Sequence, residues 1–149
     1  MNTLPDRDKF AGRPREEVLR IIRDSGLVDE RWYRATYRDV ADGGLDPVAH
    51  YVDHGADEGR NPNSHFDTRW YAKTYADVRA AGVDPLLHYA IDGAREGRRA
   101  GPAFDTAYYL AQNPDVGRGV LNPLVHYLRL GLREGRLARS YPFGLGAGG

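Results

Sequence analysis

Histidine at a fixed spacing is the first feature of this sequence that suggests chemistry. His50, His88 and His126 lie 38 residues apart, and a tyrosine follows each of them. A metal site needs several ligands that converge on one ion, whereas this spacing places one histidine in each of three units. A ligand set within one unit, such as His88 with Asp77 or Asp84, has no recognised spacing. We interpret each histidine as a hydrogen-bonding partner across a pair of helices, and we predict no metal and no cofactor.

An aspartate and an arginine recur with the same period of 38 residues. They could form either a catalytic pair or an ion pair within each unit. A small array rarely carries three equal copies of a catalytic centre, whereas a charge-assisted bond within each unit is naturally copied with the unit. A glutamate two residues before each arginine is predicted to serve the same turn. We therefore predict ion pairs, and a protein that is not an enzyme. The residues are Asp39, Asp77, Asp115, Glu58, Glu96, Glu134, Arg60, Arg98 and Arg136.

Aromatic residues provide the third kind of chemistry, because the chain contains 10 tyrosines and 2 tryptophans. Aromatic rings beside carboxylates suit sugars, whose C–H faces stack on the rings and whose hydroxyls need acceptors. Most of these rings fall at predicted core positions, so only the exposed ones can form a binding face. The candidate ligand-binding residues are Trp32, Trp70, Tyr108, Arg60, Arg98 and Arg136.

All of these residues belong to three tandem copies of one 38-residue unit, which align without insertion or deletion. The units span residues 28–65, 66–103 and 104–141. Eleven positions are identical in all three copies, and they identify what one supersecondary unit needs in order to be repeated. We predict an all-α protein made of helix-turn-helix repeats, arranged as a short solenoid or as a compact bundle.

The first helix of each unit has clear start and stop signals, which we describe for the second unit. Asp67 is a good N-cap, and Phe66 before it has the spacing of a hydrophobic staple with Tyr71. In the third unit Pro114 predicts that this helix stops near Gln112. We expect the other copies to end at the same point.

The second helix begins at Asp84 and Pro85, an N-cap followed by proline at the first helical position. Gly93 suits a left-handed C-terminal stop of this helix, and Gly97 suits a tight turn with a positive φ angle. No run of residues alternates between apolar and polar types, so we predict no sheet.

Residues 13–27 are predicted to form an amphipathic helix that caps the open apolar end of the first unit. Pro14 suits its first turn, Ile21 and Ile22 lie on its apolar face, and Gly26 ends it. We expect residues 1–12 to be disordered. We expect the glycine-rich residues 142–149 to form a flexible tail.

Charge and hydropathy exclude several classes of protein. Lys+Arg and Asp+Glu both total 21, which argues against a nucleic-acid binder with its excess of positive charge. No stretch approaches the ~20 apolar residues that span a bilayer, and the first residues lack the apolar core of a secretory signal. We predict cytoplasmic synthesis without a cleavable signal, and leave open a destination at a cell surface or on a particle.

The unit resembles a helical repeat that is widespread in bacteria. The second unit has the sequence FDTRWYAKTYADVRAAGVDPLLHYAIDGAREGR, and the third has FDTAYYLAQNPDV and then NPLVHYLRLGLREGR. The family pattern is FDxxYYLxxNPDV followed by [DN]PLxHYxxxGxxEGR, and the resemblance covers Ile21 to Tyr141, with Val28 where the family has Phe. The resemblance implies the company of glycosyltransferase domains, surface-polysaccharide proteins and large secreted proteins. It implies no catalytic residues.

These observations predict a non-catalytic repeat protein that binds a bacterial surface polysaccharide or docks onto glycan-handling machinery. The alternative is a structural protein–protein adaptor, for example a self-assembling subunit of a spike or coat-like particle. An adaptor would present a contiguous apolar surface patch.

Overall fold

The computed structural model describes Phe10 and residues 12–140, and every regular element in this part of the chain is helical. The prediction of an all-α fold is therefore confirmed. The predicted flexible tail lies outside the described residues, and so does the predicted disordered N-terminus apart from Phe10 and Gly12. Phe10 is buried, and its ring stacks on the imidazole of His88 at 5.6 Å between ring centroids.

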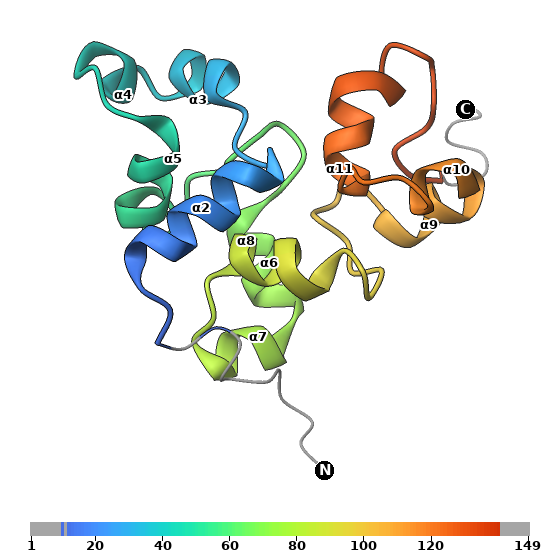
Figure 1. The fold of residues 1–149 in the computed structure, drawn as a ribbon, viewed down its shortest axis with the longest axis horizontal. Helices are drawn as coiled ribbons and strands as arrows, with labels where there is room; N and C mark the ends of the chain where they lie inside the picture. Colours follow the sequence, from blue (N-terminus) through green and yellow to red (C-terminus); the bar gives the residue numbers. More distant parts are fainter. Residues whose placement is uncertain (1–9, 11, 141–149) are drawn as a thin grey trace.

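Each unit contains three helical segments instead of the two that we predicted. Figure 1 shows the units in chain order, with the second between the first and the third. The first unit comprises α3 (Glu30–Thr36), α4 (Arg38–Asp42) and α5 (Pro47–His50), which continues into a π-helical turn (Tyr51–Gly55). The second comprises α6 (Thr68–Thr74), α7 (Ala76–Ala81) and α8 (Pro85–His88), with a π-helical turn at Tyr89–Gly93. The third comprises α9 (Thr106–Gln112), α10 (Pro114–Gly117) and α11 (Pro123–His126), with a π-helical turn at Tyr127–Gly131.

The additional helix in each unit arises at one residue with a non-helical backbone, namely Tyr37, Tyr75 or Asn113. Its φ and ψ angles are −113° and 87°, −104° and 88°, and −133° and 71°, respectively. The first helix therefore ends at the predicted position in all three units. The chain then resumes a short helix, which our prediction omitted. In the third unit Pro114 enforces the break, whereas in the first two units a tyrosine occupies the break.

The predicted caps and staples are confirmed. The carboxylates of Asp29, Asp67 and Asp105 each accept a hydrogen bond from a backbone N–H three residues on, at 3.0–3.1 Å. Such caps satisfy amides that have no partner within the helix. The rings of Phe66 and Tyr71 lie 5.2 Å apart, which is the contact expected of a hydrophobic staple.

Gly93 has a different role from the predicted left-handed stop. It lies inside the π-helical turn, and its φ is not positive, whereas Gly97 has the predicted positive φ of 78°. A Cβ atom on Gly93 would overlap the hydroxyl of Tyr71, and the equivalent clashes occur at Gly55 and Gly131. Glycine is therefore needed here because a tyrosine from the first helix occupies the space of a side chain.

Hydrogen bonds close each unit and join it to the next. The backbone N–H of Asp67 donates to the carbonyl of Ala100 at 3.0 Å, so the end of the second unit returns to its start. The buried hydroxyl of Tyr51 lies 2.8 Å from that of Thr68 in the following unit, and Tyr89 repeats this contact with Thr106 at 2.7 Å. Burial makes such polar contacts obligatory.

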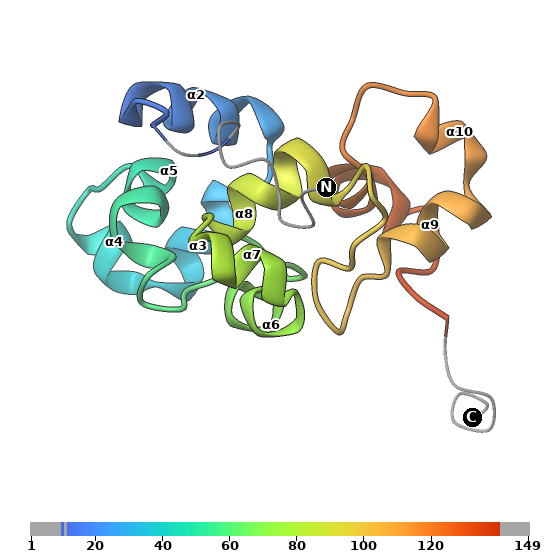
Figure 2. The ribbon, with the colours of Figure 1, turned by 90° about the horizontal axis from the view of Figure 1, so that it is seen from below.

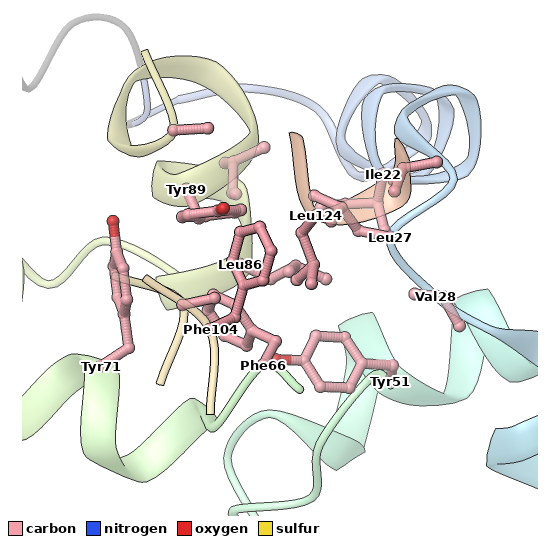
Figure 3. Close-up of a cluster of buried hydrophobic side chains, with 14 of the residues drawn as sticks. Ile22, Leu27, Val28, Tyr51, Phe66, Tyr71, Leu86, Tyr89, Phe104 and Leu124 are labelled. Atoms are coloured by element: carbon pink, nitrogen blue, oxygen red, sulfur yellow. The ribbon is translucent and has the colours of Figure 1, made fainter. Parts of the chain in front are cut away.

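The array is compact, because the third unit folds back to the segment before the first. A Cβ on Gly26 would lie 2.8 Å from a guanidinium nitrogen of Arg129 and 3.5 Å from the side chain of Val125. Figure 3 shows side chains of α2, the second unit and the third unit in one cluster, for example Ile22, Leu86 and Leu124. The structure therefore favours the compact bundle over the extended solenoid.

The N-terminal helix α2 (Arg15–Ser25) covers more than the first unit. It packs on α5 of the first unit and on α8 of the second, and Figure 2 shows it lying across both. Gly26 ends the helix in the left-handed conformation, with φ 76°, as predicted. The helix that we predicted to cap the first unit thus packs against the first and the second unit.

We predict that Gly93→Ala lowers the free energy of unfolding by about 1–3 kcal/mol, because the new methyl group collides with the Tyr71 hydroxyl. The double variant Gly93→Ala with Tyr71→Phe lacks that hydroxyl, so its loss is expected to be smaller than the sum of the two single losses. Urea denaturation of the wild type, the two single variants and the double variant measures this difference. Gly119→Ala is the control, and we expect it to change the free energy of unfolding by close to zero. Additive losses would contradict the steric explanation.

Candidate binding surface

The three repeated histidines are structural, as predicted. The Nδ1 atoms of His50, His88 and His126 lie 2.8–2.9 Å from the hydroxyl of the tyrosine 17 residues earlier in the chain. Burial raises the pKa of these tyrosines, that of Tyr109 to about 12, and lowers the pKa of His50 and His88. Among the described residues no group of three or more His, Cys, Asp or Glu is placed to hold a metal ion.

The predicted ion pairs are present in all three units. Two nitrogens of the Arg60 guanidinium donate to the two oxygens of Asp39 at 2.9 Å, and its Nε lies 2.9 Å from Glu58. Arg98 holds Asp77 in the same way at 2.8 Å. These bonds lower the pKa of Asp39 and Asp77, because a neighbouring cation favours the charged carboxylate.

A tyrosine joins the tryptophan and the arginine of the first two units. The guanidinium of Arg60 lies 4.8 Å above the ring of Tyr37, and Trp32 contacts the same ring edge-on at 6.1 Å. In the second unit Arg98 lies 4.9 Å above Tyr75, and Trp70 contacts it at 6.2 Å. The structure therefore brings the candidate tryptophan and arginine together through a residue that our sequence reasoning did not select.

The third unit departs from this arrangement at two positions, and the first is Tyr108 in place of the tryptophan. At the second, Asn113 replaces the tyrosine, and its side-chain oxygen accepts a hydrogen bond from Arg136 at 3.0 Å. Arg136 also contacts Asp115 at 3.3 Å and Glu134 at 2.8 Å. Tyr108 is half-buried, as are Trp32 and Trp70.

We call these three groups of side chains the repeat clusters. Their guanidinium side chains are only 21–26% exposed, whereas the glutamates are 39–50% exposed. The arginines therefore hold the acids in place, and the three glutamates with Asp39 and Asp115 are exposed as hydrogen-bond acceptors, whereas Asp77 is only 25% exposed. The members are Trp32, Tyr37, Asp39, Glu58 and Arg60; Trp70, Tyr75, Asp77, Glu96 and Arg98; and Tyr108, Asn113, Asp115, Glu134 and Arg136.

Two surface grooves occupy equivalent places between consecutive units, and our sequence reasoning did not identify them. The first junction groove, between units one and two, has a volume of about 440 Å³, and the second, between units two and three, about 430 Å³. Their walls share eight positions that are 38 residues apart in the sequence. These positions are Ala56 and Ala94, Asp57 and Arg95, Ala72 and Leu110, Arg79 and Gly117, Gly82 and Val120, Val83 and Leu121, Asp84 and Asn122, and Pro85 and Pro123.

We predict that Asp77→Asn destabilises the protein by about 1 kcal/mol at neutral pH, between the values for exposed ion pairs and charge-assisted hydrogen bonds. The folded state lowers the pKa of Asp77, so its contribution is complete above about pH 5 and is lost as the pH falls through the unfolded and then the folded pKa. Denaturation at several pH values should therefore show the two proteins converging below pH 4.

Asp42→Asn is the control, because its carboxylate is 73% exposed and lies 3.9 Å from Arg38. We expect a change below about 0.5 kcal/mol at pH 7. A constant difference between wild type and Asp77→Asn from pH 7 to pH 3 would contradict an electrostatic role for Asp77.

Comparisons with known proteins do not place this chain in a family. No family model, curated protein or solved structure matches it. Among the described residues no helix has the length and apolar character needed to cross a membrane.

Proposed function

We propose that the protein is a non-catalytic carbohydrate-binding protein that recognises a bacterial surface polysaccharide through its repeat clusters. The observation that supports this proposal most is that, in each of the first two units, a half-buried tryptophan and an arginine that holds two acidic side chains contact the same tyrosine. In the first unit the tryptophan is Trp32, and the acidic side chains are Asp39 and Glu58.

The chemistry of a repeat cluster matches that of a sugar. Sugar hydroxyls are hydrogen-bond donors, and carboxylate oxygens accept such bonds strongly. An aromatic ring offers an apolar surface beside them, for the C–H face of the sugar. A polysaccharide repeats its own units, so several weak clusters on one rigid protein can contact it together and raise the overall affinity.

The electrostatics of the clusters support binding over catalysis. A general acid at neutral pH needs a carboxyl group whose pKa is raised. The pKa values of Asp39 and Asp77 are instead lowered by Arg60 and Arg98. These carboxylates remain ionised, which suits permanent hydrogen-bond acceptors.

The resemblance to bacterial repeats that accompany glycosyltransferases and surface-polysaccharide proteins agrees with this proposal. It also supports docking onto glycan-handling machinery and a destination at a cell surface or on a particle. Under this proposal, the clusters of the first two units contribute most, because the third lacks the tyrosine that joins ring and arginine.

The third unit favours a second candidate function, a structural adaptor. Val120 is fully exposed, and Leu130, Leu132 and Leu137 are 40%, 56% and 48% exposed. The position of Leu132 is occupied by Ala94 in the second unit, where it is buried and lines the second junction groove. An apolar surface at this end of the array suits docking of a protein partner.

We predict that Trp70→Ala abolishes binding to the polysaccharide without unfolding the protein. Its loss of stability is expected to be about 2–4 kcal/mol, because the half-buried ring loses its buried apolar area and its edge-on contact with Tyr75. Calorimetric titration against bacterial capsular and outer-surface polysaccharides measures the binding. Trp70→Tyr is the matched control, since the third unit has Tyr108 at this position, and it should retain binding.

Two outcomes would contradict this proposal in different ways. Unchanged binding by folded Trp70→Ala would remove this ring from the site. Absence of binding to any polysaccharide, together with concentration-dependent self-association in sedimentation that Leu132→Ala reduces, would establish the adaptor function in its place.

A further inference from the structure

The two junction grooves have nearly the same volume but different charged residues. Arg69 and Arg79 line the first junction groove. The equivalent positions in the third unit are Ala107 and Gly117, so the second junction groove lacks these two guanidinium groups. It has Arg95 where the first groove has Asp57, and Arg95 forms an ion pair with Asp92. The difference lies in the side chains added to a shared groove, which is how a repeat protein acquires a specific site.

The two arginines differ from those of the repeat clusters in their partners. Arg69 donates to the backbone carbonyl of Glu58 at 2.9 Å, and Arg79 donates to the carbonyls of Ala72 and Lys73 at 3.2 Å. Among the described residues neither guanidinium forms an ion pair with a carboxylate of the protein. Their positive charges are therefore available to an anionic ligand, and a guanidinium suits a carboxylate in particular.

Acidic residues on the same groove add a second kind of recognition. Asp57 is exposed and lines the groove. Asp84 is engaged as the N-cap of α8, where it accepts from the N–H of Leu87 at 3.0 Å, and burial raises its pKa. The groove thus combines two cations with an exposed acceptor for hydroxyl groups.

We propose that the first junction groove binds a uronic acid residue of an acidic polysaccharide. Arg69 and Arg79 contact the sugar carboxylate, and Asp57 accepts hydrogen bonds from the ring hydroxyls. This inference rests on the proposed carbohydrate-binding function and specifies its sugar class. The groove volume of about 440 Å³ lies within the range of about 300–1,000 Å³ that is usual for small-ligand sites.

Residues that line the groove are adjacent to members of two repeat clusters. Arg69 bonds to the backbone of Glu58, whose side chain belongs to the first cluster, and Arg69 precedes Trp70 of the second cluster in α6. Arg69 also lies over Gly59, where a Cβ would overlap its guanidinium. A chain bound along the clusters would therefore place a sugar residue at the groove.

The test is a calorimetric titration of the full chain with tetragalacturonate and with the same oligomer after reduction of its carboxyl groups. Wild type is expected to bind the charged oligomer at least ten times more tightly than the neutral one. The double variant Arg69→Ala with Arg79→Ala should lose this preference. These replacements suit the fold, because the chain has Ala107 and Ala41 at the equivalent positions.

A second variant controls for net charge. Arg20→Ala with Arg133→Ala removes two positive charges at exposed positions outside the groove, and it should retain the wild-type preference. A gain of function gives an independent readout, in which Ala107→Arg and Gly117→Arg, together with Arg95→Asp at the position of Asp57, build the proposed site into the second junction groove. Gly117 has no positive φ, and a Cβ there would meet only Leu110 at 3.7 Å, so we expect binding of a second tetragalacturonate per protein.

Three results would overturn the inference: no binding of tetragalacturonate by wild type, equal affinity for the charged and neutral oligomers, or unchanged preference in the Arg69 and Arg79 variant. Equal affinity for both oligomers would still support carbohydrate binding. The Trp70→Ala titration tests that broader function with other polysaccharides, so the two failures can be distinguished.

Discussion

The hydrogen bond between Tyr71 and His88 connects most of the features that recur in this array. The Tyr71 side chain is completely buried, so its hydroxyl needs a partner. The imidazole of His88, the last residue of α8, supplies one at 2.8 Å. The ring reaches that partner only where the facing residue lacks a Cβ, which requires Gly93. One buried polar contact thus explains a tyrosine, a histidine and a glycine that are identical in all three units.

The repeat clusters show how each unit holds charged side chains at defined positions on its surface. Arg98 bonds to Asp77 and Glu96 and also covers the ring of Tyr75 at the break between α6 and α7. The positive charge of Arg98 is thereby compensated within the protein, and the more exposed side chains of the cluster are the acidic ones. Arg79 is bonded instead to backbone carbonyls, which leaves its charge uncompensated. The partner of each arginine therefore determines whether it has a structural role or is available to a ligand.

Most local features were predictable from the sequence, because they depend on residues within one turn of each other or on strict repetition. The caps at Asp67 and Asp84 and the pairing of Asp77 with Arg98 belong to this class. The role of Gly93 was not predictable, since it depends on a hydroxyl attached 22 residues earlier. The break at Tyr75 was predictable only from Pro114 at the following position of the third unit, because tyrosine itself has no marked tendency to end a helix. The short helix α7 that resumes after the break was missed. The junction grooves and the packing of α2 against two units arise from contacts between units. An alignment of the units with one another gives no information about such contacts.

The contact of Arg129 and Val125 with Gly26 has a consequence for how the chain unfolds. In an open array each repeat touches only its neighbours, and stability is a sum of local terms along one dimension. Here the last unit also packs against the segment before the first, and α2 bridges two units. Detaching any one unit exposes surface belonging to the others, so the three copies are coupled into a single cooperative transition, in the manner of a small globular domain.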